Sequence, residues 1–114
     1  MTQKELKELL PYWQKRLRLL DWNVNMKFLD LDNDYGSCDC NVEDKTVKIK
    51  ILKFSDKLWK DDDDVTAERV LVHEILHIHF WELHEGDTSH ALMPRIEQLC
   101  NFIADALVPL DDTK

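Results

Sequence analysis

Residues 68–80 read ERVLVHEILHIHF, and they include the pentapeptide His-Glu-Ile-Leu-His at positions 73–77. Apolar residues fall on most sides of a helix drawn from residue 65 to about residue 84, which is typical of a central, buried helix. Gly86 is well placed to end it, because glycine readily adopts the left-handed conformation that closes helices. The sequence therefore predicts a central helix packed against both a sheet and another helix.

The chemistry of this helix lies in the H-E-x-x-H pattern. Residues four apart share one face of a helix, so the imidazoles of His73 and His77 can both point at one metal ion. Glu74, next to the first histidine, then reaches the water bound to that ion. Burying these polar groups among apolar neighbours without partners would cost several kcal/mol, which a metal ion would offset. We expect His73 and His77 to bind one Zn²⁺ ion, with Glu74 as the general base.

A catalytic zinc ion needs a third protein ligand and one open position for water. His84 lies about 10 Å beyond His77 along a continuous helix, which is too far to share the ion. Glu97 belongs to a second predicted helix, which runs from residue 89 or 94 to residue 107. An antiparallel return of this helix would bring Glu97 back beside the motif, so Glu97 is the predicted third ligand.

Two further residues receive supporting roles. Asn101, one turn after Glu97, can accept the outward N–H of His73 or His77 and so fix the tautomer that binds metal; helix capping or hydration is the alternative. His90, in or near the loop between the two helices, is a candidate hydrogen-bond donor to a developing oxyanion, and a solvated loop histidine is the alternative.

The N-terminal half of the chain predicts a helix followed by strands. Leucines recur at helical spacing over residues 3–20, where Pro11 is expected to kink the helix or open a second one. Strict alternation of apolar and polar residues then predicts three strands, the last two joined as a hairpin. The strands are expected at residues 22–28, 37–42 and 47–51. The predicted fold is thus α+β, with an N-terminal helix, a short twisted antiparallel sheet of about three strands, the central helix and a C-terminal ligand helix.

Two smaller features complete the local pattern. Four acids at residues 61–64 directly precede the central helix, where carboxylates can cap its free amides and oppose its dipole. Cys38 and Cys40 point to the same side of their strand, and we interpret them as buried small residues rather than a metal or redox pair.

Length and charge limit the classes of function. The 114 residues suffice for one domain, predicted as residues 1–114, and the net charge of −8 repels phosphate backbones and anionic lipid. No direct nucleic-acid partner and no membrane partner are expected. Three cysteines are too few and odd in number for a disulfide framework, and the N-terminus has no signal-like apolar segment. We therefore expect a cytoplasmic protein.

Residues 65–108 resemble the zincin metallopeptidases, which carry H-E-x-x-H on a central helix. The nineteen residues between His77 and Glu97 are similar to the gluzincin arrangement, in which a glutamate of the next helix is the third ligand. The segments ERVLVHEILHIHF and IEQLCNFIADALV are similar to those of small phage-associated and bacterial metallopeptidases related to the ImmA/IrrE and SprT-like groups. The resemblance implies a zincin-like fold, with His73, His77 and Glu97 as zinc ligands and Glu74 as the base. Gluzincins often carry an aspartate where this chain has Asn101.

These observations predict a zinc-dependent peptidase that acts on a peptide or protein substrate. The polar strand at residues 37–41 is a candidate edge to which an extended substrate could add. A non-catalytic zinc-binding regulatory or interaction module is the alternative, in which a fourth side chain from His84 or His90 would close the metal site. A third hypothesis is a metal-free helical partner protein, in which the H-E-x-x-H pattern occurs by chance and binds no metal.

Overall fold

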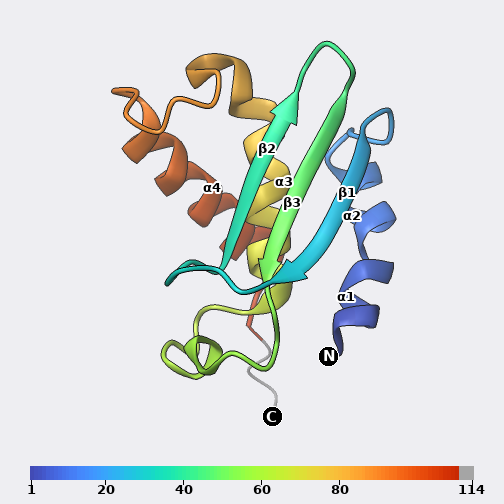
Figure 1. Cartoon of the computed structure of the whole chain (residues 1–114), viewed down its shortest axis with the longest axis vertical. Helices are drawn as coiled ribbons and strands as arrows, with labels where there is room; N and C mark the ends of the chain where they lie inside the picture. Colours follow the sequence, from blue (N-terminus) through green and yellow to red (C-terminus); the bar gives the residue numbers. More distant parts are fainter. Residues whose placement is uncertain (111–114) are drawn as a thin grey trace.

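The protein combines helices with one sheet, as the computed structural model shows for residues 1–110 (Figure 1). The last four residues of the predicted domain lie outside the described range. The elements are α1 (Gln3–Glu8), α2 (Leu10–Arg16), β1 (Asn23–Leu29), β2 (Gly36–Asn41), β3 (Thr46–Leu52), a short 3-10 helix (Lys57–Lys60), α3 (Ala67–His84) and α4 (Met93–Leu107). The predicted α+β class is confirmed.

The N-terminal helix predicted for residues 3–20 is in fact two short helices. Thr2 and Glu5 form a capping box that begins α1, and Pro11 lies in the first turn of α2, where its missing N–H costs nothing. The expected break at Pro11 is therefore confirmed, whereas the predicted end at residue 20 is wrong. The chain leaves the helix after Arg16, because Arg18 adopts a left-handed backbone with a φ of 63°.

The sheet is mixed, which corrects the prediction of an antiparallel sheet. β2 and β3 form the expected antiparallel hairpin, but β1 pairs with β3 in parallel, so the strand order is β1-β3-β2. The crossover that parallel pairing requires is supplied by the loop after β1, by β2 and by the hairpin turn. Alternation of residue types identifies each strand but carries no information about which strands are neighbours. β2 is consequently an edge strand, as the prediction for residues 37–41 expected.

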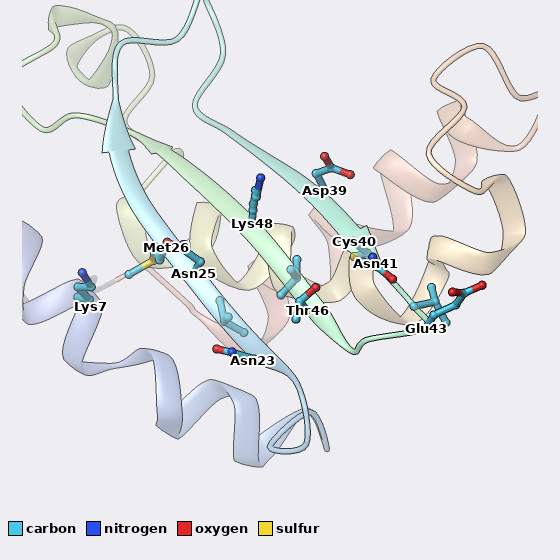
Figure 2. Close-up of a pocket in the computed structure, with 13 residues that line it drawn as sticks. Lys7, Asn23, Asn25, Met26, Asp39, Cys40, Asn41, Glu43, Thr46 and Lys48 are labelled. Carbon is cyan, nitrogen blue, oxygen red and sulfur yellow. The ribbon is translucent and has the colours of Figure 1, made fainter.

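The two faces of the sheet differ sharply in polarity. On one face of β3, Val47, Ile49 and Ile51 are at most 2% exposed and pack into the core, while Lys48 and Lys50 lie exposed on the other. The exposed face carries a wide hollow of about 950 Å³, in which Lys48 is flanked by residues from both neighbouring strands (Figure 2). None of the predicted site residues lines this hollow.

The helix α3 is buried along most of its length, as its apolar sequence predicted. It lies behind the sheet, with α4 on one side and α2 on the other (Figure 1). Its N-cap is Thr66, whose hydroxyl accepts the Arg69 N–H at 3.2 Å. The prediction that the acids at 61–64 cap this helix is therefore wrong: they end two residues too early, and within them the Asp62 carboxylate accepts the N–H of Asp64 instead.

The end of α3 and the return of the chain determine where α4 lies. α3 ends at His84, as predicted, and the chain turns through Glu85 and Gly86, both with a positive φ. At the far end of α4, the guanidinium of Arg69 donates to the carbonyl oxygen of Val108 at 2.6 Å, which fixes α4 against α3. Neither these helices nor the others in residues 1–110 have the length and apolar composition needed to cross a membrane.

Candidate functional site

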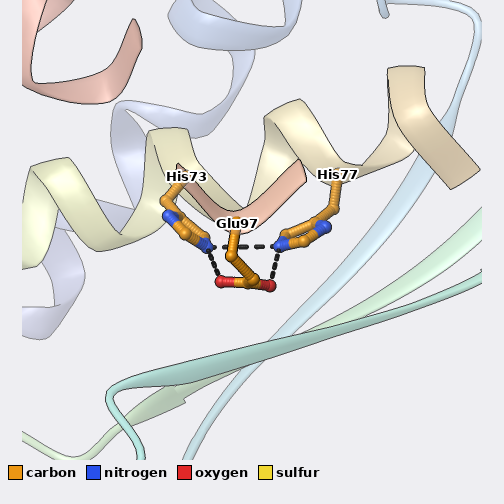
Figure 3. Close-up of side chains that lie close together, drawn as sticks. All are labelled: His73, His77 and Glu97. Carbon is orange, nitrogen blue, oxygen red and sulfur yellow. Dashed lines mark hydrogen bonds and ion pairs between the residues drawn. The ribbon is translucent and has the colours of Figure 1, made fainter. Parts of the chain in front are cut away.

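The structure brings His73, His77 and Glu97 together (Figure 3). Nε2 of His73 and Nε2 of His77 lie 3.2 Å apart, and they lie 3.0 and 2.8 Å from the two carboxylate oxygens of Glu97. The ligand atoms of all three residues lie within 4.8 Å of one another. Among residues 1–110 this is the only group of three or more metal-ligating side chains with such spacing.

Helix geometry explains why these three side chains meet. His73 and His77 are four residues apart on α3, so their rings lie on one face of the helix, in an edge-to-face arrangement with centroids 4.9 Å apart. α4 buries the face formed by Ile96, Cys100 and Ala104. This packing places the neighbouring Glu97 at the junction of the two helices, where it is half-exposed. The expected antiparallel return of the chain thus brings Glu97 to the motif, and its role as a ligand stays a prediction.

The electrostatics of the group favour a carboxylate beside two imidazoles. Hydrogen bonds from His73 and His77 hold the pKa of the Glu97 carboxyl well below its usual range. Burial lowers the pKa of His73, but the Glu97 hydrogen bond and the charge of Glu74 outweigh burial, and the net pKa of His73 is raised. Without metal, Glu97 is therefore a charged carboxylate, and its charge favours a proton on the His73 imidazole.

Glu74 is the buried carboxyl group of the site. It is 7% exposed, and this burial raises its pKa to about 7, an effect that His73 and His77 partly oppose. A carboxyl group with a pKa near neutrality can both accept and return a proton, as general acid–base catalysis requires. That value belongs to the metal-free chain, and a cation bound nearby would lower it.

A cleft passes over Glu74 on both sides of the three converging side chains. One cavity of about 230 Å³ extends toward the N-terminal end of α3 and is lined by Tyr35, Arg69 and Asn101 among others. A second cavity of about 340 Å³ extends toward the C-terminal end of α3 and is lined by Cys38, Trp81 and His84 among others. Gly36, Glu74 and Glu97 line both. The cleft is therefore bordered by the edge strand β2 and by both helices.

Gly36 is a site residue that sequence reasoning missed. A Cβ atom at this position would lie 2.9 Å from Cγ1 of Val70 and 3.1 Å from both Cγ and Oε2 of Glu74. Only glycine lets the start of β2 approach α3 this closely beside the predicted base. The signal in the sequence was its rarity, since the chain has two glycines, but rarity alone does not indicate which helix approaches.

We expect Gly36→Ala to weaken both folding and the site. The added methyl group would push against Val70, whose branched side chain has little rotamer freedom in a helix, and against Glu74. Overpacking of this kind lowers the free energy of unfolding by about 1–3 kcal/mol. Chemical denaturation measures this change, and Ser37→Ala, at an exposed position of the same strand, is the control. Unchanged stability in Gly36→Ala would show that the close approach is not required.

Of the two residues predicted to support the site, Asn101 and His90, only one lines the cleft. Asn101 lines the same cavity as His73, and its side chain makes a small contribution to the raised pKa of His73. His90 lines neither cavity; its Nδ1 accepts the N–H of Leu92 in the turn before α4. The structure therefore brings Asn101 to the site and leaves His90 outside it.

The structure corrects the predicted burial of Cys38 and Cys40 and leaves His84 outside the metal-ligating group. Cys38 and Cys40 are half-buried rather than buried, with sulfur atoms 3.6 Å apart, and Cys38 lines the cleft. The hydrogen bond with Cys40 and burial raise the pKa of the Cys38 thiol far above its usual range, so it stays protonated. His84 does not join the metal-ligating group of the described residues, but its ring centroid lies 6.4 Å from that of His77, closer than the separation expected along the helix axis.

Comparison of the chain with models of known protein families, with curated proteins and with solved structures finds no match. The resemblance to zincins therefore rests on the motif and its spacing.

Proposed function

We propose that this chain is a zinc-dependent peptidase with a zincin-like arrangement. The observation that carries the proposal is the convergence of His73, His77 and Glu97 beside the buried carboxyl group of Glu74. Two imidazoles and one carboxylate match the donor set of catalytic zinc sites, which use three protein ligands and keep one position open. The resemblance to gluzincins supports the same assignment.

The donor atoms fit a single metal ion. Both imidazoles present the same nitrogen, Nε2, toward the Glu97 carboxylate, and these atoms form the close group described above. Zn²⁺ held by these atoms would supply a Lewis acid for the scissile carbonyl and a bound water with a pKa lowered toward 7. Asn101, beside His73, is suited to hold that imidazole in its metal-binding tautomer.

Glu74 is placed to carry out both proton transfers of the proposed reaction. Glu74 lies one position after the first histidine and lines both halves of the cleft, so its carboxylate can take a proton from the attacking water. The same carboxyl group then returns the proton to the departing amine, which completes hydrolysis of the peptide bond. Burial of Glu74 removes competing water and strengthens its interaction with the reacting groups.

The edge strand β2 supplies a path for an extended substrate. It pairs only with β3 within residues 1–110, and its first residues border the cleft on both sides of Glu74. A peptide that adds to this free edge would gain main-chain hydrogen bonds that do not depend on its sequence. Such a peptide would lie across the proposed metal-binding group.

The alternative of a zinc-binding interaction module has less support. A structural zinc site is closed by a fourth protein ligand, and no fourth side chain in residues 1–110 joins the group. A purely structural site also activates no water, so it needs no general base such as Glu74 beside its ligands. A metal-free partner protein would leave the convergence of three ligand side chains in one cleft unexplained.

Hydrolysis of fluorescently labelled casein by the zinc-loaded chain tests the proposal. We expect cleavage that stops when a chelator removes the metal and returns when zinc is added. A chain that binds zinc but cleaves neither casein nor a peptide library would favour the interaction module instead.

A further inference from the structure

One buried side chain near the cleft lacks a hydrogen-bond partner. His84 is 4% exposed, and its Nε2 is the only fully enclosed side-chain nitrogen or oxygen of residues 1–110 without a hydrogen bond. Its ring lines the second cavity, which also contains Glu74, His77 and Glu97. An unmet buried donor is costly to folding, so its position beside the proposed site calls for a functional explanation.

The other ring nitrogen of His84 fixes which nitrogen carries the proton. Nδ1 accepts the backbone N–H of Gly86 at 3.0 Å, so this nitrogen has no hydrogen of its own. A neutral imidazole then carries its hydrogen on Nε2. The unpartnered atom is therefore an N–H donor.

The surroundings restrict what this donor can bind. Asp34, Glu74 and Glu97 line the same cavity and would repel a carboxylate or phosphate. Trp81 and Met93 supply apolar walls. A neutral oxygen acceptor attached to an apolar group fits both features. The main-chain carbonyl of a peptide residue with an apolar side chain has this chemistry.

We propose that the cavity around His84 is a subsite for an apolar residue of the substrate, whose main-chain carbonyl accepts a hydrogen bond from His84 Nε2. This inference rests on the proposed peptidase function and adds a substrate preference to it. Because Nε2 is closed to water, cavity side chains shift when the carbonyl enters. Met93, unbranched and half-buried, is the most adaptable of them.

Two hydroxamates separate this contact from metal binding. Acetohydroxamate carries only the metal-binding group, whereas the hydroxamate of malonyl-leucine amide adds a leucine residue whose side chain is apolar and whose own main-chain carbonyl is free to accept a hydrogen bond. We expect the zinc-loaded chain to bind both in calorimetry, with the leucine compound tighter. His84→Asn keeps an acceptor near the Nδ1 position for Gly86 but loses the donor at Nε2. It is expected to bind the leucine compound about tenfold more weakly and acetohydroxamate unchanged.

His84→Gln is the matched variant, because its amide nitrogen can occupy the Nε2 position and restore the donor. We expect it to recover most of the lost affinity. Equal affinity of His84→Asn and the unchanged chain for the leucine compound would overturn the inference while leaving the peptidase proposal intact. Failure of the unchanged, zinc-loaded chain to bind either hydroxamate would instead contradict the metal-dependent peptidase, and the subsite with it.

A nitrogen-15 NMR experiment on the unchanged chain tests the donor without any substitution. His84 is expected to carry its hydrogen on Nε2 both before and after zinc is added, and the Nε2–H resonance should shift when the hydroxamate of malonyl-leucine amide binds. A hydrogen on Nδ1, or loss of the Nε2 hydrogen on addition of zinc, would overturn the inference, because His84 would then be differently bonded or a metal ligand.

Discussion

The Glu74→Gln variant is expected to retain its zinc and to lose at least about 100-fold in the rate of casein hydrolysis. Positioned acid–base groups typically contribute between about 100-fold and 10,000-fold to a reaction. The amide of glutamine has nearly the shape of the carboxyl group but cannot take a proton, so binding of metal and substrate should persist. Initial rates and zinc content, measured on the same preparation, test this expectation.

Glu82→Gln provides the matched control for this variant. Glu82 lies exposed on α3 and lines neither cavity of the cleft, so the same chemical change there should leave hydrolysis unaltered. A Glu74→Gln variant with full activity would remove Glu74 from the mechanism. Loss of zinc together with activity would show that the carboxyl group supports the metal site rather than the chemistry.

Glu97→Ala is expected to have the second large effect, the loss of bound zinc. Removal of a residue that merely supports a metal ligand weakens affinity about 10-fold to 100-fold, and removal of a ligand should weaken it at least as much. The carboxylate that now lies 3.0 and 2.8 Å from the two imidazoles would be gone. Zinc titration followed by elemental analysis measures the change, and hydrolysis should fall in parallel.

Gln98→Ala is the control for Glu97→Ala, because Gln98 is the next residue of α4 and is exposed. It should bind zinc as tightly as the unchanged chain. If Glu97→Ala retained full zinc affinity, the third ligand would have to come from another residue, and the gluzincin-like assignment would be wrong.

Periodicity made the local elements of this chain predictable. The spacing of His73 and His77 predicted a shared helix face, and the interval to Glu97 predicted its return beside them. Both predictions need only the pitch of a helix and a short connection. The alternation around Lys48 and Lys50 likewise identified β3 as a strand with one buried face.

The features that the sequence left open all depend on contacts between elements. The parallel pairing of β1 with β3 is a choice among neighbours, and residue alternation is the same for either choice. The need for glycine at position 36 arises from the approach of Val70 and Glu74, which are more than thirty residues away. The unpartnered donor of His84 appears only once the cavity around it is built.

Zinc content of the chain, purified without a metal-binding tag and without added zinc, tests the central claim most directly. Our account predicts one zinc ion per chain, retained in Glu74→Gln and lost in Glu97→Ala. A folded chain that contains no zinc and takes up none when zinc is added would contradict it, because the convergence of His73, His77 and Glu97 would then serve no metal.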